Sequence, residues 1–112
     1  MYLEEKKLGE TNIDNVGKIL LEAADYIERR GWCQHTPEGH AGKVCAVGAL
    51  LYVATNMNHP VWGPVWGMSS LALLASARLG KYLGTDGIES WNDTLGRTED
   101  EVVAALRAAA RS

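Results

Sequence analysis

Two cysteines and two histidines lie within one short stretch of the chain, and their side chains are the clearest candidates for chemistry. Two thiolates and two imidazoles form a ligand set that suits tetrahedral zinc, and here they are Cys33, His35, His40 and Cys45. The spacing is unfavourable, because a single residue separates Cys33 from His35 and no Cys-x-x-Cys knuckle is present. The pattern therefore favours two buried cysteines that pack as small apolar side chains and two solvated loop histidines. We expect no metal and no cofactor.

Cys45 is also a candidate nucleophile. We expect it at the start of a helix, where the N-terminal end lowers the pKa of a thiol. A base for it can come from His35, His40 or His59, and Asn92 or Asp93 can orient that base. Cys45 also begins an apolar run, which favours burial and an inert thiol. The sequence therefore predicts a protein without enzymatic activity. A small thiol-dependent enzyme or zinc protein is the alternative, with catalytic candidates Cys33, Cys45, His35, His40 and Asp93.

A disulfide between the two cysteines is a third possibility for this stretch. Closing the loop between Cys33 and Cys45 stabilises a protein by roughly 3 kcal/mol in an oxidising setting. The N-terminus carries charges where a secretory signal needs an apolar core, so we expect a soluble cytoplasmic protein with reduced thiols. Its longest apolar run, Val44 to Ala54, is shorter than the roughly 20 residues that cross a bilayer.

Tryptophan occurs in a tandem repeat, Pro60-Val61-Trp62-Gly63 followed by Pro64-Val65-Trp66-Gly67. Its prolines and glycines exclude a regular helix. The two tryptophans either fold back over the core or present at least one rigid aromatic anchor to a partner, since tryptophan is enriched in binding hot spots. The candidate partner-binding residues are Val61, Trp62, Val65 and Trp66.

The Trp91-Asn92-Asp93 segment has two interpretations. It can form a binding corner, or it can be structural, with Trp91 filling a gap between helices while Asn92 or Asp93 hydrogen-bonds nearby backbone. The structural interpretation is favoured, because short polar side chains in turns usually bind backbone groups.

Composition limits the function further. The chain has 112 residues, is 46% hydrophobic and carries a net charge of −3, which is typical of one globular domain without a basic field for nucleic acid. We expect residues 1–12 to form an N-terminal arm and residues 13–112 a single helical domain. No nucleic-acid or membrane partner is expected.

Helical periodicity and caps predict an all-α bundle of about four helices. The predicted helices cover Ile13 to Arg30, Val44 to Asn56, Ser69 or Ser70 to near Gly84, and a last helix that starts with a capping box at Thr98 and Glu101, while Ile88 to Asp93 makes one turn. A Pro/Gly/Trp-rich loop joins the second and third. The residues predicted to face inward on the third helix are Leu71, Leu74, Ala75, Leu79 and Tyr82.

Several landmarks occur together and in a fixed order. They are Ala23-Ala24-Asp25-Tyr26-Ile27, Gly31-Trp32-Cys33-Gln34, Val44-Cys45 with Gly48-Ala49-Leu50, Trp91-Asn92-Asp93, and Gly96-Arg97-Thr98 with Glu101-Val102. Together they resemble a family of small proteins from actinobacteria and their phages that forms a domain of unknown function. The resemblance covers roughly Leu20 to Ala109. It implies a helical, cytoplasmic protein, and no activity, substrate or catalytic residue comes with it.

The sequence therefore predicts a non-enzymatic cytoplasmic protein-interaction module. Its partner is another protein or a second copy of the chain. If the chain is phage-encoded, an accessory role that modulates a host protein fits its size.

Overall fold

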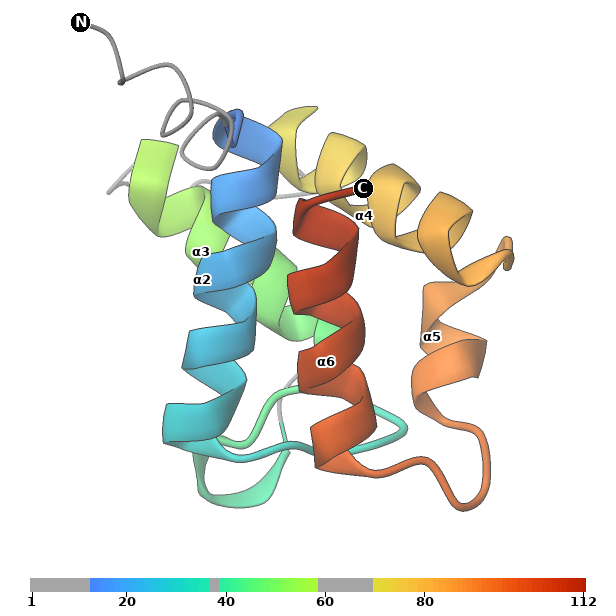
Figure 1. Cartoon of the computed structure of the whole chain (residues 1–112). Coiled ribbons are helices and arrows are strands. Elements are labelled where there is room, and N and C mark those ends of the chain that lie inside the picture. Colours follow the sequence, from blue (N-terminus) through green and yellow to red (C-terminus); the bar gives the residue numbers. More distant parts are fainter. Residues whose placement is uncertain (1–12, 37–38, 59–69) are drawn as a thin grey trace, which may run out of the picture.

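The structure, a computed structural model, describes residues 13–36, 39–58 and 70–112. Its helices, labelled as in Figure 1, are α2 (Asn15–Arg30), η1 (His40–Gly42), α3 (Ala46–Asn58), α4 (Ser70–Leu83), α5 (Ile88–Asn92) and α6 (Glu99–Ala110). Within these ranges the only β pairing is the isolated bridge between Trp32 and Val44. The all-α prediction is confirmed for the described residues. The predicted arm, residues 1–12, and the Pro/Gly/Trp-rich loop lie outside them.

Helix α2 has caps that the sequence makes readable at both ends. Asp14 precedes it and accepts a hydrogen bond from the Gly17 N–H at 2.8 Å. Gly31 ends it with a φ of 99°, in the left-handed region that favours glycine. Asp14 also binds both terminal nitrogens of Arg78 from α4, at 2.9 and 2.7 Å. Arg78 and the Gly17 amide together lower the pKa of Asp14 from 3.8 to about 2.

Helix α2 contacts the three other long helices, α3, α4 and α6. Figure 1 shows α2 and α6 side by side, with α4 crossing near the C-terminal end of α6. Surface charges cross-link the pair, because Arg107 of α6 lies 2.9 Å from Asp25 and 2.7 Å from Glu28 of α2. The largest fully buried hydrophobic side chains are Ile19, Leu20, Ile27, Leu50, Leu79, Leu106 and Val102.

Helices α3 and α6 follow their sequence signals closely. Residues 46–50 of α3 are buried on every side, as the apolar sequence predicts, although the helix begins two residues later than Val44. The predicted capping box of α6 is present, since the Thr98 hydroxyl accepts from the Glu101 N–H at 3.2 Å and the Glu101 carboxylate accepts from the Thr98 N–H at 3.0 Å. Among the described residues, no helix combines the length and apolarity needed to cross a membrane.

Helix α4 is rotated relative to the prediction. Ala75 and Leu79 are buried as expected, but Leu74 and Tyr82 are largely exposed, and Ala72 is buried instead. The predicted inward face is therefore wrong at Leu74 and Tyr82, whereas Leu71 is partly buried against the core. The helix packs through small side chains at positions 72 and 75, which let its neighbours approach closely, and this leaves leucines on its outer surface.

Candidate functional site

Asn92, the last residue of α5, is completely buried, with 0% of its surface exposed. Its Oδ1 accepts from the Trp32 indole N–H at 2.7 Å and from the Ala46 backbone N–H at 3.1 Å. Its Nδ2 donates to the Cys33 carbonyl at 3.2 Å and to Asp93 Oδ1 at 3.0 Å. Both protons and both lone pairs of the carboxamide are therefore used.

The Asn92 side chain stands where a β-ladder rung would be. Val44 donates to the Gly31 carbonyl at 3.0 Å, and its own carbonyl accepts from the Cys33 N–H at 3.1 Å, which is the parallel pattern. The next rung of such a ladder joins the Ala46 N–H to the Cys33 carbonyl. The Asn92 carboxamide lies between those two groups and bonds to both. It extends the bridge by one rung in place of a backbone peptide.

The segment after Cys33 is held by the end of α5. The Gln34 side-chain amide donates to the carbonyls of Asn92 and Thr94 at 3.0 and 3.1 Å. His35 donates its backbone N–H to Asp93 Oδ1 at 2.8 Å, and its Nδ1 lies 3.7 Å from Asp93 Oδ2. The His35 amide and then the Asn92 side chain lower the pKa of the Asp93 carboxyl. We call the residues joined by these bonds the Asn92 junction: Trp32, Cys33, Gln34, His35, Ala46, Asn92 and Asp93.

Cys45 directly precedes α3 and is buried. Its Sγ accepts from the Gly48 N–H at 3.3 Å, in the manner of a helix cap. Burial nevertheless raises the pKa of the Cys45 thiol above 9.0, outweighing the opposing hydrogen bonds from the Gly48 and Val47 amides. The expectation that the helix N-terminus lowers this pKa is therefore wrong, because desolvation of the thiolate is the larger effect.

The candidate residues end up at the Asn92 junction or outside the described part. Cys33, Cys45, His35 and Asp93 gather around Asn92. The Cys33 thiol donates to the Thr36 carbonyl at 3.4 Å, and the His35 side chain is 75% exposed. In the part of the chain that the structure describes, no group of three or more His, Cys, Asp or Glu side chains is placed to hold a metal ion. The candidates whose side chains lie outside this part are His40, His59, Val61, Trp62, Val65 and Trp66.

A stacked arginine secures the far side of α5. The Arg97 guanidinium lies 4.0 Å from the centre of the Trp91 ring, and its Nε donates to the Trp91 carbonyl at 3.0 Å. Thr94 adds a hydroxyl bond to the Ser90 carbonyl at 2.9 Å. The structural interpretation of the Trp-Asn-Asp segment predicted bonds from Asn92 or Asp93 to nearby backbone. Both side chains do bond backbone groups, but those groups belong to distant segments of the chain. The sequence landmarks include Arg97, Trp32 and Gln34, but their contacts were not predicted. The partners of Trp32 and Gln34 are about 60 positions away in the chain.

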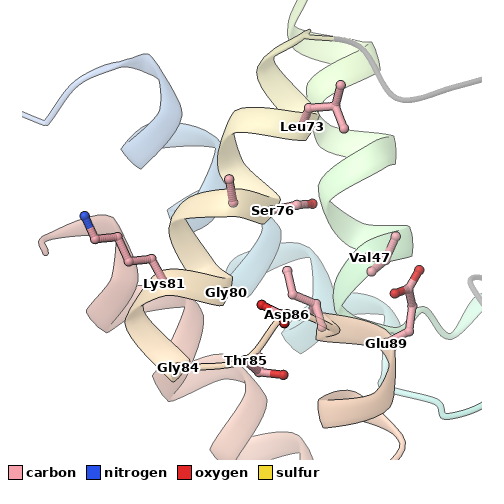
Figure 2. A pocket seen from close by; sticks show the side chains of 11 residues that line it. Val47, Leu73, Ser76, Gly80, Lys81, Gly84, Thr85, Asp86 and Glu89 are labelled. Carbon is pink, nitrogen blue, oxygen red and sulfur yellow. The ribbon is translucent and has the colours of Figure 1, made fainter.

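A groove lies between α3, α4 and α5. It has a volume of about 700 Å³, and the residues that we call the α4 groove are Val47, Leu73, Ser76, Ala77, Gly80, Lys81, Gly84, Thr85, Asp86, Ile88 and Glu89. Figure 2 shows Leu73 and Ser76 of α4 pointing towards α3, with Val47 of α3 and Glu89 of α5 beside each other. Leu73 is 56% exposed.

The charges around the α4 groove are uneven. Asp86 and Glu89 are both exposed at the α5 end. The Lys81 side chain points away from α3 in Figure 2, so it does not stand opposite these carboxylates. The groove therefore combines an apolar lining with an acidic end. The sequence did not reveal it, because its lining comes from three helices that only the fold brings together.

Comparison with known proteins gives one match. A family of unknown function, DUF6197, matches residues 12–112. The chain belongs to this family. No curated protein and no solved structure matches the chain. The family match extends over both the Asn92 junction and the α4 groove, so both are parts of the family's domain.

Proposed function

We propose that this DUF6197 protein is a non-enzymatic module that binds a segment of another protein in the α4 groove. The observation that carries the proposal is the exposed leucine at its edge. Leu73 keeps 56% of its surface in water beside a groove of about 700 Å³. Full burial of a leucine side chain contributes roughly 1.5–3 kcal/mol, so covering Leu73 supplies binding free energy that the isolated fold leaves unused.

The lining of the α4 groove indicates the chemistry of the partner. Val47, Ala77 and Ile88 offer apolar contacts, and Asp86 with Glu89 places two carboxylates at one end. An apolar segment with a neighbouring lysine or arginine complements both features. A basic side chain at that end gains from the carboxylates, whereas an acidic one is repelled.

The state of the candidate catalytic groups supports a role without catalysis. Asn92 has no hydrogen-bonding capacity left for a substrate. Cys45 is buried with a raised pKa, which keeps its thiol protonated near neutral pH. Elemental analysis of protein purified without chelator, combined with thiol labelling at neutral pH, tests the alternative of a thiol-dependent enzyme or zinc protein. Stoichiometric zinc or one hyper-reactive thiol establishes that alternative.

The tryptophan repeat belongs to the same proposal as a second contact. Val61, Trp62, Val65 and Trp66 are partner-binding residues in it, and they lie outside the described residues. The proposal also includes a cytoplasmic location and, if the chain is phage-encoded, an accessory role towards a host protein.

The test is cross-linked capture from extract of the native host with tagged full-length protein. The baits are the wild type, Leu73→Ser, Leu95→Ser and the double variant Trp62→Ala/Trp66→Ala. Leu95 is the matched control, because it is 97% exposed in the turn after α5, does not line the groove and undergoes the same substitution. We expect one protein that wild type and Leu95→Ser capture and that Leu73→Ser captures at least tenfold less.

Two outcomes contradict the proposal. Equal capture by Leu73→Ser shows that the α4 groove is not the site. Loss of capture with Leu95→Ser as well shows a general apolar effect. Loss with the tryptophan variant, while its thermal unfolding is unchanged, adds the repeat to the binding surface, whereas loss of folding shows that these tryptophans are core.

A further inference from the structure

The structure holds its two cysteines next to each other, on the two segments joined by the isolated β-bridge. Trp32 is bridged to Val44 in parallel, and each cysteine directly follows one of these residues. We propose that Cys33 and Cys45 are an oxidisable pair that forms an intramolecular disulfide on reaction with a peroxide. This modification site is independent of the α4 groove and of the proposed binding function.

The register of the bridge places Cys33 opposite Cys45. Paired strands lie about 4.7–4.9 Å apart, and a disulfide needs a Cα–Cα distance of about 4.4–6.8 Å. The Cys33 N–H bonds directly to the Val44 carbonyl, whereas the Cys33 carbonyl accepts from the Asn92 carboxamide instead of from the Ala46 N–H. Because Cys33 and Cys45 are in register in a parallel pairing, their side chains leave the bridge on the same side.

The surroundings of the two sulfurs support this placement. A negative charge on Cys33 is close enough to disfavour ionisation of Cys45. Gly39 stands against the Cys33 sulfur, since a Cβ at that position would lie 3.2 Å from Sγ. The pair is also unequal, because Cys45 is buried whereas Cys33 is partly exposed. Peroxide therefore reaches Cys33 first.

The reaction needs only the two thiols and hydrogen peroxide. The Cys33 thiolate attacks one peroxide oxygen, so that an S–O bond forms, the O–O bond breaks and the leaving hydroxide takes up a proton as water. The Cys45 thiol then loses its proton and attacks the Cys33 sulfur, which forms the S–S bond and expels the second hydroxide, again protonated to water. Two thiols and one peroxide become one disulfide and two waters.

The product ties the segment after Trp32 to the start of α3. The ring contains the segment from Cys33 to Cys45, including η1. The new covalent link lies beside Asn92, which bonds to the Cys33 carbonyl and the Ala46 N–H. Closing a loop of this size removes conformational freedom from the unfolded chain. We expect oxidation to raise Tm by about 12 °C.

The test uses the full chain, reduced, desalted and treated with hydrogen peroxide. Intact mass and peptide mapping of the monomer should show a loss of about 2 Da, a Cys33–Cys45 linked peptide and reversal by dithiothreitol. Cys45→Ser is the key variant, because serine preserves the helix cap. In this variant a dimedone adduct should accumulate on Cys33 instead. Cys33→Ser should react at least tenfold more slowly than the wild type, because the remaining thiol is buried.

The proposal is overturned if oxidised wild type carries sulfinic or sulfonic acid on Cys33 while Cys45 remains alkylatable after unfolding. Disulfide-linked dimers as the main product overturn it equally. The wild-type mapping stands even if a variant fails to fold, because it needs no substitution. The groove does not enter any of these measurements, so failure here leaves the proposed binding function unaffected.

Discussion

The Asn92 junction and the α4 groove both include residues of α5 and use their side chains in opposite ways. At the junction, one buried carboxamide makes four hydrogen bonds to groups from three segments. At the groove, an exposed leucine and an apolar lining face water beside two exposed acidic residues. The junction has used all its bonding capacity within the fold, whereas the groove keeps its capacity available.

The comparison distinguishes polar residues of types found in active sites from exposed residues that are available to bind a partner. A buried polar group costs free energy unless every donor and acceptor is satisfied, and among the described residues no buried side-chain nitrogen or oxygen lacks a partner. Asn92 and Asp93 therefore serve the architecture. An exposed apolar side chain such as Leu73 contributes little to folding, so its position is free to serve binding.

The comparison predicts that Asn92→Ala destabilises the protein far more than any substitution in the groove. It removes the partner of the Trp32 indole N–H, the Ala46 N–H and the Cys33 carbonyl, each costing about 1–3 kcal/mol when left unsatisfied. We expect the free energy of unfolding in urea to fall by about 3–5 kcal/mol. Asn15→Ala, the same change at an exposed position, should cost less than about 0.5 kcal/mol. A loss below about 1 kcal/mol for Asn92→Ala breaks the contrast.

Arg97→Ala should cost less, because Arg97 supports the junction from outside. It removes the contact with the Trp91 ring and one hydrogen bond to the Trp91 carbonyl. The expected loss is about 1–2 kcal/mol, again from urea unfolding. The control is Arg111→Ala at the exposed end of α6, where we expect a change within about 0.5 kcal/mol. Equal effects of the two would mean that the stacked geometry is without energetic value.

Acid should weaken the junction. The folded state holds the pKa of Asp93 below 3.8, so its carboxylate stabilises the fold above about pH 4 and loses that effect as pH falls through the lowered pKa. Asp93 is partly exposed, which limits the effect to about 1 kcal/mol or less. Two proteins are compared, one with Asp93 and one with Asp93→Asn. Both carry Asp14→Asn, because the pKa of Asp14 is about 2 and falls within the pH range used. Between pH 5 and pH 2, the urea midpoint should fall more for the protein that keeps Asp93.

If the urea midpoint falls equally in the two proteins, the hydrogen bonds to the Asp93 carboxylate contribute nothing to stability. The same outcome would leave the side chains of Asn92 and Gln34 as the polar anchors of the junction. Asp86 and Glu89 of the groove are present in both proteins, so the difference between the two proteins bears on the junction alone.

Leu73→Ser should have the smallest effect on stability and the clearest effect on binding. Because Leu73 is largely exposed, we expect the free energy of unfolding to change by no more than about 0.5 kcal/mol. Partner capture should fall at least tenfold. A stability loss above about 1 kcal/mol would show that Leu73 belongs to the core, and the comparison between junction and groove would then fail.

Local signals account for the helices that were predicted correctly. Asp14 and Gly31 mark the ends of α2, and Thr98 with Glu101 marks the start of α6. These signals act within one helical turn, so a single sequence contains them. The inward face of α4 was mispredicted at Leu74 because burial there depends on which neighbours pack against the helix. Helical periodicity identifies an apolar face, but it does not predict that the helix will pack through its small residues, which turns the buried face away from Leu74.

Residue type and short spacing are enough to specify the helices of this protein and to identify the side chains capable of chemistry. What those side chains do depends on the folded arrangement. Asn92 bonds to Trp32 and Cys33, which are about 60 positions away in the chain. The pKa of Cys45 is raised because burial outweighs the lowering effect of the amides at the start of the helix. Hydrogen-bond partners and desolvation depend on packing. Packing brings together segments that are distant in the chain, and the local pattern of one segment does not predict which other segment it will contact.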